Sequence, residues 1–151
     1  MMKEQKKLNY ELAILDVADR VHEKFKLIYA ENNNGSRVKS TTDEAWINQN
    51  GTDRADLAKL KYDELPMDWK NERWCGCKVA LDLVLDAHAK EEIFDNDFIE
   101  KASSFVHEDW LNRNGDKAEK EHRRSYEDLS KEAKEKDRIF VCAAIETFQE
   151  T

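Results

Sequence analysis

Apolar side chains recur every three or four positions through the first thirty residues, which is the pattern of an amphipathic helix. The series stops at an asparagine-rich segment that closes with Gly35, a residue that readily takes the left-handed conformation found at helix ends. We therefore predict a first helix whose buried stripe is formed by Leu8, Leu12, Leu15, Val21, Phe25 and Ile28.

The helical periodicity resumes after residue 42 and is bounded by residues typical of helix ends. Pro66 suits a first helical turn, because its missing N–H would have no intrahelical partner there, and Asp95 or Asn96 can cap a helix start. Gly76 costs its helix about 1 kcal/mol relative to alanine, which indicates close approach of a neighbouring helix. We predict further helices near residues 42–50, 66–90, 95–114 and 130–150, with loops at 36–42 and 52–61.

The chain also contains an internal duplication. The segment Glu44 to Gly51 is repeated by Glu108 to Gly115, sixty-four positions later, and the same offset sets Tyr62 to Leu65 on Tyr126 to Leu129. Chance rarely aligns several segments in one register. The predicted units of the repeat are residues 44–86 and 108–150.

Composition agrees with a helical fold. Hydrophobic residues make up 40% and charged residues 38% of the chain, while one proline and four glycines are too few for many short strands. We predict an all-α fold, a single domain over residues 1–151 with about five helices. It is an internally duplicated helical bundle in which the long third and fifth helices pack at the centre.

Charge and hydropathy limit the classes of partner. The net charge of −8 arises from 33 acidic and 25 basic residues and repels phosphate backbones, so we expect no nucleic-acid partner. No apolar run approaches the roughly 20 residues of a membrane span, and no secretory signal follows Met1. Three cysteines fit reduced thiols. We expect no membrane partner and a cytoplasmic location.

The segment Ala102 to Trp110, followed by Tyr126 to Arg138, resembles the ryanodine-receptor-type repeat domain. That family has a helix carrying His-Glu-x-Trp, then a Tyr-Asp-x-Leu turn that opens a charged helix with an apolar end. The first half matches through Trp46 and the run Tyr62 to Pro66, with its His-Glu pair displaced to residues 22–23. The family's Gly-Trp-x-Tyr-Gly and His-Pro elements are absent from both halves. The resemblance implies a paired helical module for ligand or protein contacts without catalytic activity. The layout is also similar to small uncharacterised bacterial and phage helical proteins.

His22 and His107 each precede a glutamate on a helix, as in some zinc sites. A zinc-binding pair needs a second histidine four residues later, and those positions hold Lys26 and Leu111. We therefore expect each ring to bond a nearby carbonyl as a structural residue. The sequence predicts no catalytic residue, no metal site and no cofactor.

The loop at residues 52–61 is the predicted recognition site, because it joins two repeated flanks while its own sequence has diverged. We expect ligand-binding residues at Trp46, Leu57, Tyr62, Arg54 and Lys59, contacting a protein partner or a small ligand. Ordinary packing of these aromatic side chains is the competing interpretation.

Two other functions stay open. One is an enzyme or nucleotide-type small-ligand sensor, in which Arg54, Lys59 and Lys61, or Arg123 and Arg124, hold phosphate beside a tryptophan. The other is a structural homodimer formed by exposed apolar residues of the first helix.

Overall fold

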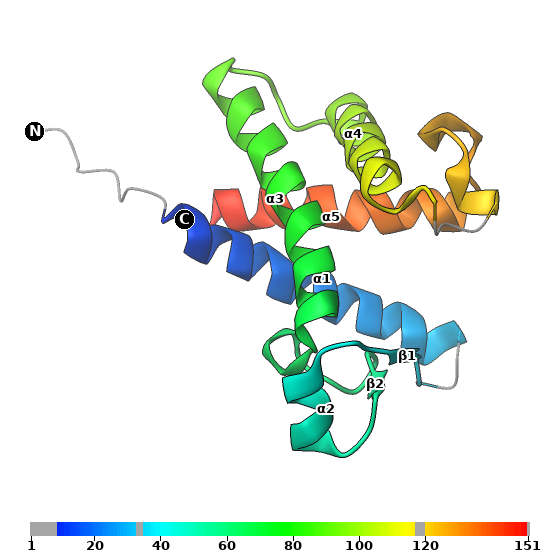
Figure 1. The fold of residues 1–151 in the computed structure, drawn as a ribbon. Coiled ribbons are helices and arrows are strands. Elements are labelled where there is room, and N and C mark those ends of the chain that lie inside the picture. Colours follow the sequence, from blue (N-terminus) through cyan, green and yellow to red (C-terminus); the bar gives the residue numbers. More distant parts are fainter. Residues whose placement is uncertain (1–8, 33–34, 117–119, 151) are drawn as a thin grey trace, which may run out of the picture.

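The computed structural model describes residues 9–32, 35–116 and 120–150. These residues form five α-helices, three short 3-10 turns (η) and one two-stranded antiparallel sheet, which confirms the predicted all-α fold (Figure 1). The elements are α1 (Tyr10–Asn32), β1 (Val38–Ser40), α2 (Glu44–Asn50), β2 (Arg54–Asp56), η1 (Tyr62–Glu64), α3 (Met67–Ala89), α4 (Asn96–Asn114), η2 (Lys120–Arg123), η3 (Tyr126–Asp128) and α5 (Lys131–Gln149).

Side chains fix where several helices begin. Asp43, Asp95 and Ser130 each occupy an N-cap position and accept a hydrogen bond from the backbone N–H three residues later. Such caps satisfy donors that have no intrahelical partner. Gly51 ends α2 with φ of 72°, the left-handed conformation that favours glycine.

Helices α3 and α5 cross at the centre, and α1 and α4 each contact both of them (Figure 1). The two central helices meet where Gly76 faces Phe140: a Cβ added to the glycine would lie 2.7 Å from the phenylalanine ring. This close contact confirms the reason predicted for Gly76. Phe140 stands sixty-four positions after Gly76, so two positions that the predicted repeat aligns touch at the crossing.

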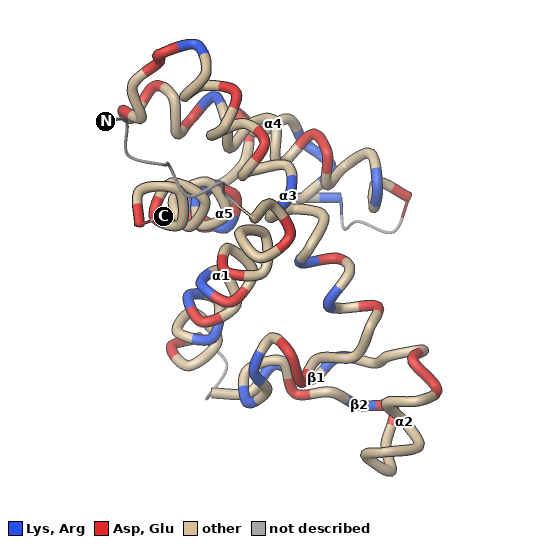
Figure 2. The backbone as a smooth tube through the Cα atoms, turned by 90° about the vertical axis from the view of Figure 1, so that its left-hand side faces the viewer, with Lys and Arg blue, Asp and Glu red and all other residues tan. Residues whose placement is uncertain are grey.

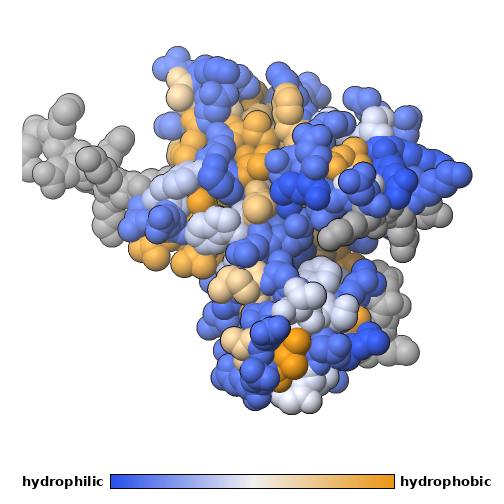
Figure 3. Space-filling model, viewed as in Figure 1, coloured by the Kyte–Doolittle hydropathy of each residue, from blue (hydrophilic) through white to orange (hydrophobic). Residues whose placement is uncertain are grey.

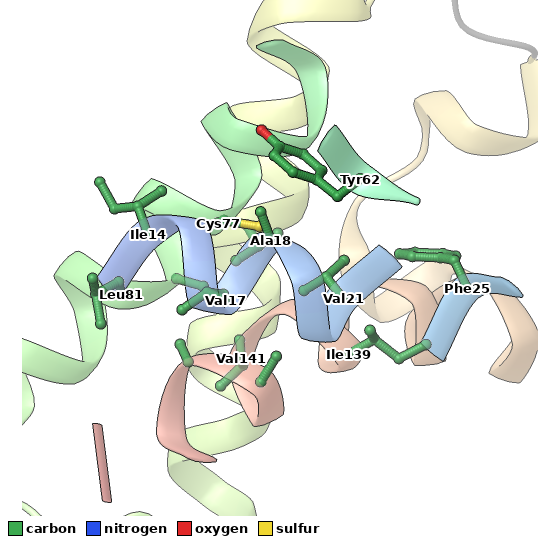
Figure 4. Packing of buried hydrophobic residues seen from close by; sticks show 14 of the residues in the cluster. Ile14, Val17, Ala18, Val21, Phe25, Tyr62, Cys77, Leu81, Ile139 and Val141 are labelled. Carbon is green, nitrogen blue, oxygen red and sulfur yellow. The ribbon is translucent and has the colours of Figure 1, made fainter. Parts of the chain in front are cut away.

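The buried face of α1 differs from the predicted stripe. Leu12 is 61% exposed and Leu15 is 38% exposed, while Leu8 lies outside the described residues. Val21 and Phe25 of the predicted stripe are buried, and Ala13, Ile14, Val17 and Ala18 take the other inner positions of α1, which packs against both central helices. The labelled core of Figure 4 comprises Ile14, Val17, Ala18, Val21 and Phe25 of α1 together with Tyr62, Cys77, Leu81, Ile139 and Val141.

The segment between α1 and η1 contains the predicted short helix, α2, but the stretches on either side that were predicted as loops include the paired strands β1 and β2. The three elements form a small subassembly. Strand β1 pairs antiparallel with β2, matching Lys39 with Ala55. Asp68 of α3 accepts a hydrogen bond from the Thr41 hydroxyl at 2.6 Å, and Asp43 accepts one from the backbone N–H of Met67 at 2.8 Å. The subassembly therefore rests on the start of α3, at the end of the molecule away from α4 and α5 (Figures 1 and 2).

The helix that corresponds to α4 is α1, because each carries a buried histidine with the same contact. Nε2 of His22 lies 2.7 Å from the carbonyl oxygen of Leu60, and Nε2 of His107 lies 2.7 Å from that of Arg124. Each carbonyl comes two residues before the tyrosine that opens η1 or η3. The predicted structural role of both histidines is confirmed. We call α1, η1 and α3 the first half, and α4, η3 and α5 the second half.

The predicted repeat needs a correction at its start. The offset of sixty-four relates η1 to η3 and the first residue of α3, Met67, to that of α5, Lys131. It fails for residues 44–51, since α2 is a separate seven-residue helix without buried residues, whereas residues 108–114 form the end of the longer α4. The histidines of α1 and α4, His22 and His107, are eighty-five positions apart. The first half is longer than the offset of sixty-four because the β1, α2 and β2 subassembly lies between α1 and η1. The two similar Trp-to-Gly segments therefore belong to helices that do not correspond, α2 and α4.

Hydrophilic side chains cover most of the face shown in Figure 3, with separate apolar patches between them. Among the described residues, no helix combines the length and the apolar composition needed to cross a bilayer.

Candidate functional site

A groove of about 700 Å³ lies between α1, η1 and α3, and we call it the first-half groove. The α1 wall carries side chains spaced four, four and three residues apart, a single helical stripe. The α3 wall has the same kind of spacing. Residues 61–63 join the two walls. The lining residues are Leu15, Asp19, Glu23 and Lys26 of α1, Lys61, Tyr62 and Asp63 around η1, and Met67, Lys70, Asn71 and Trp74 of α3.

Buried contacts hold the joining segment in place. The neutral His22 ring donates its Nε2 proton to the Leu60 carbonyl, and burial lowers the pKa of this histidine. The Tyr62 hydroxyl, directed toward α3 in Figure 4, donates to the backbone carbonyl of Lys70 at 3.1 Å. Burial raises the pKa of Tyr62 to about 12, so this phenol stays protonated as a donor. The floor of the groove is thus fixed to both walls.

Apolar side chains remain exposed in the groove. Leu15 is 38% exposed and Met67 is 55% exposed, while Trp74 packs its inner part against the core. Large apolar and aromatic groups that line a concavity are the usual anchor points for a bound partner.

The charged side chains of the groove are only partly matched with one another. Lys26 pairs with Glu23 at 3.4 Å. In the part of the chain that the structure describes, Asp19 and Asp63 have no hydrogen bond or ion pair through their side chains. Partial burial raises the pKa of Asp19, and the neighbouring carboxylates of Asp16, Asp63 and Glu23 raise it further. An added cation would relieve this repulsion.

The equivalent place in the second half is crossed by an ion pair. Arg138 of α5 binds Glu100 of α4 through two hydrogen bonds of 2.6 and 2.5 Å, and Tyr126 donates to the same carboxylate at 3.0 Å. Arg138 holds the pKa of Glu100 below its usual range. The first half has Trp74 at the position of Arg138 and Leu15 at that of Glu100. These replacements remove the bridge and leave the first-half groove.

Of the predicted binding residues, only Tyr62 lines the groove. Leu57 is buried in the core, as expected for a loop that folds back, and Trp46 donates its indole N–H to the Glu64 carbonyl at 3.0 Å. Arg54 is exposed on β2, and Lys59 is exposed with its ammonium 3.9 Å from Asp56. The structure therefore does not bring the five residues together.

Sequence reasoning missed the residues of the α1 wall and most of the α3 wall. Leu15 was assigned to the buried stripe, which hid its place at the groove. The sequence signal for the groove is that Leu15 and Trp74 replace the oppositely charged Glu100 and Arg138. This signal is visible after α1 is aligned with α4.

A smaller cavity of about 220 Å³ lies in the second half beside the start of α5. It includes Arg124, one of the two arginines considered for phosphate binding; the other, Arg123, donates to the Asp116 carbonyl at 3.4 Å. No three His, Cys, Asp or Glu side chains of the described chain are grouped as metal ligands.

Comparison with known proteins gives no family: no family model, no curated protein and no solved structure matches the chain.

Proposed function

We propose that the chain is a non-catalytic binding module that seats a segment of another protein in the first-half groove. The observation that carries this proposal is the difference between the halves. One shared frame is closed by the Glu100 and Arg138 pair in the second half and open between Leu15 and Trp74 in the first.

The composition of the groove supports a protein partner. A volume of about 700 Å³ falls in the range of ligand sites. The groove combines exposed apolar groups with charged side chains from three elements, and protein interfaces contain the same mixture. The resemblance to the ryanodine-receptor-type repeat domain, which implies a helical module for protein or ligand contacts, supports the same proposal.

The test closes the groove with the protein's own second-half residues. A random peptide library displayed on phage is selected on the wild-type chain, and binding of the recovered peptides is measured by fluorescence anisotropy. The double variant Leu15→Glu, Trp74→Arg recreates the second-half bridge and is expected to weaken binding at least tenfold, or about 1.4 kcal/mol.

Two further variants separate loss of the groove from loss of the fold. Met67→Glu changes an exposed groove residue and should also weaken binding, while Leu27→Glu changes an exposed leucine of α1 outside the groove and should not. Circular dichroism and urea unfolding check that each variant folds. The proposed function is wrong if no peptide is recovered, or if the peptides bind the closed variant and Met67→Glu as tightly as the wild type.

A further inference from the structure

The charges of the first-half groove identify the chemistry of its partner. Asp19 stands one helical turn after Leu15 on the α1 wall, and Asp63 lies on the joining segment. Neither carboxylate has a side-chain partner among the described residues, whereas the acid of the second half, Glu100, holds Arg138. The first half thus has carboxylates beside the groove, at positions other than that of Glu100, without a guanidinium paired to them.

The molecule shows how it accommodates guanidinium groups elsewhere. Arg138 donates two hydrogen bonds to one carboxylate, that of Glu100, in the second half. Arg73 places its guanidinium 4.2 Å from the centre of the Phe25 ring in the first half. The groove offers both types of contact, since Trp74 presents an aromatic surface beside the carboxylates.

We infer that the first-half groove binds an arginine-bearing segment of a partner protein. The arginine lies in the space that the Glu100 and Arg138 pair fills in the second half. Its guanidinium pairs with Asp19 and Asp63 and stacks on Trp74, and an apolar neighbour in the segment contacts Leu15 and Met67. This inference rests on the proposed function, which places a protein segment in the same groove.

The lysines of the groove do not favour an acidic segment to the same extent. Lys26 is already paired with Glu23. Lys61 and Lys70 also line the groove, and each can bind a carboxylate of the segment beside the arginine. The carboxylates around Asp19, in contrast, repel one another and gain from a cation. A segment with an arginine next to an apolar residue therefore matches the groove better than one with several acids.

The experiment uses the selected peptides that need the open groove. Their sequences should be enriched in arginine relative to the unselected library. In one such peptide, exchange of the arginine for citrulline removes the charge at nearly constant shape. This exchange should weaken binding to the wild type about tenfold, the effect of losing a hydrogen bond between charged groups.

A double-mutant cycle assigns the contact. The citrulline exchange should weaken binding to Asp19→Asn by less than about threefold, because the carboxylate that the arginine pairs with is gone. It should keep its full effect against Glu108→Gln, an exposed acid in the second half. Groove-dependent peptides without arginine, or an equal citrulline effect on Asp19→Asn and the wild type, would overturn the inference and leave the proposed function standing. Failure to recover any groove-dependent peptide overturns both.

Discussion

The two halves share a frame and differ in the side chains that fill it. In each half a buried histidine binds a backbone carbonyl. The tyrosine that stands two residues after this carbonyl opens a short turn before a long helix. The halves differ in the side chains between their two helices. A salt bridge joins α4 to α5 in the second half, while a groove lies between α1 and the start of α3 in the first. Packing of the frame therefore constrains the contacts at the turn and leaves the space beside it free to change.

The environment of the histidines shows the same division. Nδ1 of His107 lies 3.4 Å from Asp137, whereas the equivalent position in the first half holds Arg73. Arg73 turns away to Phe25 and donates to the Tyr29 hydroxyl, and Nδ1 of His22 is buried without a partner in the described part of the chain. One histidine contact is kept in both halves, and the second ring nitrogen lies close to a carboxyl group in the second half but not in the first.

The largest effect should come from testing the equivalence of the halves at the helix crossing. Gly76→Phe alone places a ring where Phe140 already lies, and overpacking of this kind is expected to cost about 3 kcal/mol or more. Phe140→Gly alone leaves a cavity and should cost about 3 kcal/mol. The double variant exchanges the two residues across the crossing, so it should recover about 1 to 3 kcal/mol of the summed loss. Urea unfolding followed by circular dichroism measures all three.

The two halves are not equivalent at the crossing if the double variant loses the sum of the free energies that the two single variants lose. Pairs of distant residues add within a few tenths of a kcal/mol, so additivity would mean that the exchanged ring finds no equivalent place. Phe25→Leu serves as a control, since it changes a neighbour of Phe140 without altering the crossing itself.

How far the sequence predicts this fold depends on the type of signal. The helices, the cap at Asp95 and the close contact at Gly76 follow from local rules, and the structure agrees. The corrected pairing of α1 with α4 does not follow, because His22 and His107 carry it through contacts with carbonyls far along the chain.

The groove was harder to predict than the helices. A leucine on a helix satisfies the apolar period whether it faces the core or a groove. The period therefore predicts burial of Leu12 and Leu15, whereas the structure buries Ile14 and leaves both leucines exposed. The strands β1 and β2 are three residues each, too short to show alternation. Their pairing depends on anchors such as Asp68, which binds Thr41 across the chain.

A second prediction sharpens the contrast at the histidines. Burial raises the pKa of Asp137 to about 7, above the ordinary value near 4 that it has in the unfolded chain. Between those values the folded state keeps a proton that the unfolded state has lost. The contribution of Asp137 to the free energy of unfolding is therefore greatest below about pH 4 and declines as pH rises to about 7.

The stability of the wild type relative to Asp137→Asn should fall by at most about 4 kcal/mol between pH 4 and pH 8, since one pKa unit corresponds to about 1.4 kcal/mol. Urea unfolding at several pH values measures this difference. Glu108→Gln, an exposed acid on α4, should show no such trend against the wild type. Parallel pH profiles for the wild type and Asp137→Asn would mean that this carboxyl ionises normally in the fold.

The smallest effects should come from the outer faces of α1 and α4. Leu12 is 61% exposed on α1 and Phe105 is 50% exposed on α4, so each already contacts solvent in the folded chain. Leu12→Ser and Phe105→Ser should each change the free energy of unfolding by no more than about 0.5 kcal/mol, as surface substitutions usually do. Loss of more than about 2 kcal/mol at Leu12 would instead place it in a packed site. Light scattering on the same variants tests the homodimer hypothesis. If α1 forms a dimer, Leu12→Ser should lower the measured molar mass toward that of the monomer, and Phe105→Ser should leave the molar mass unchanged.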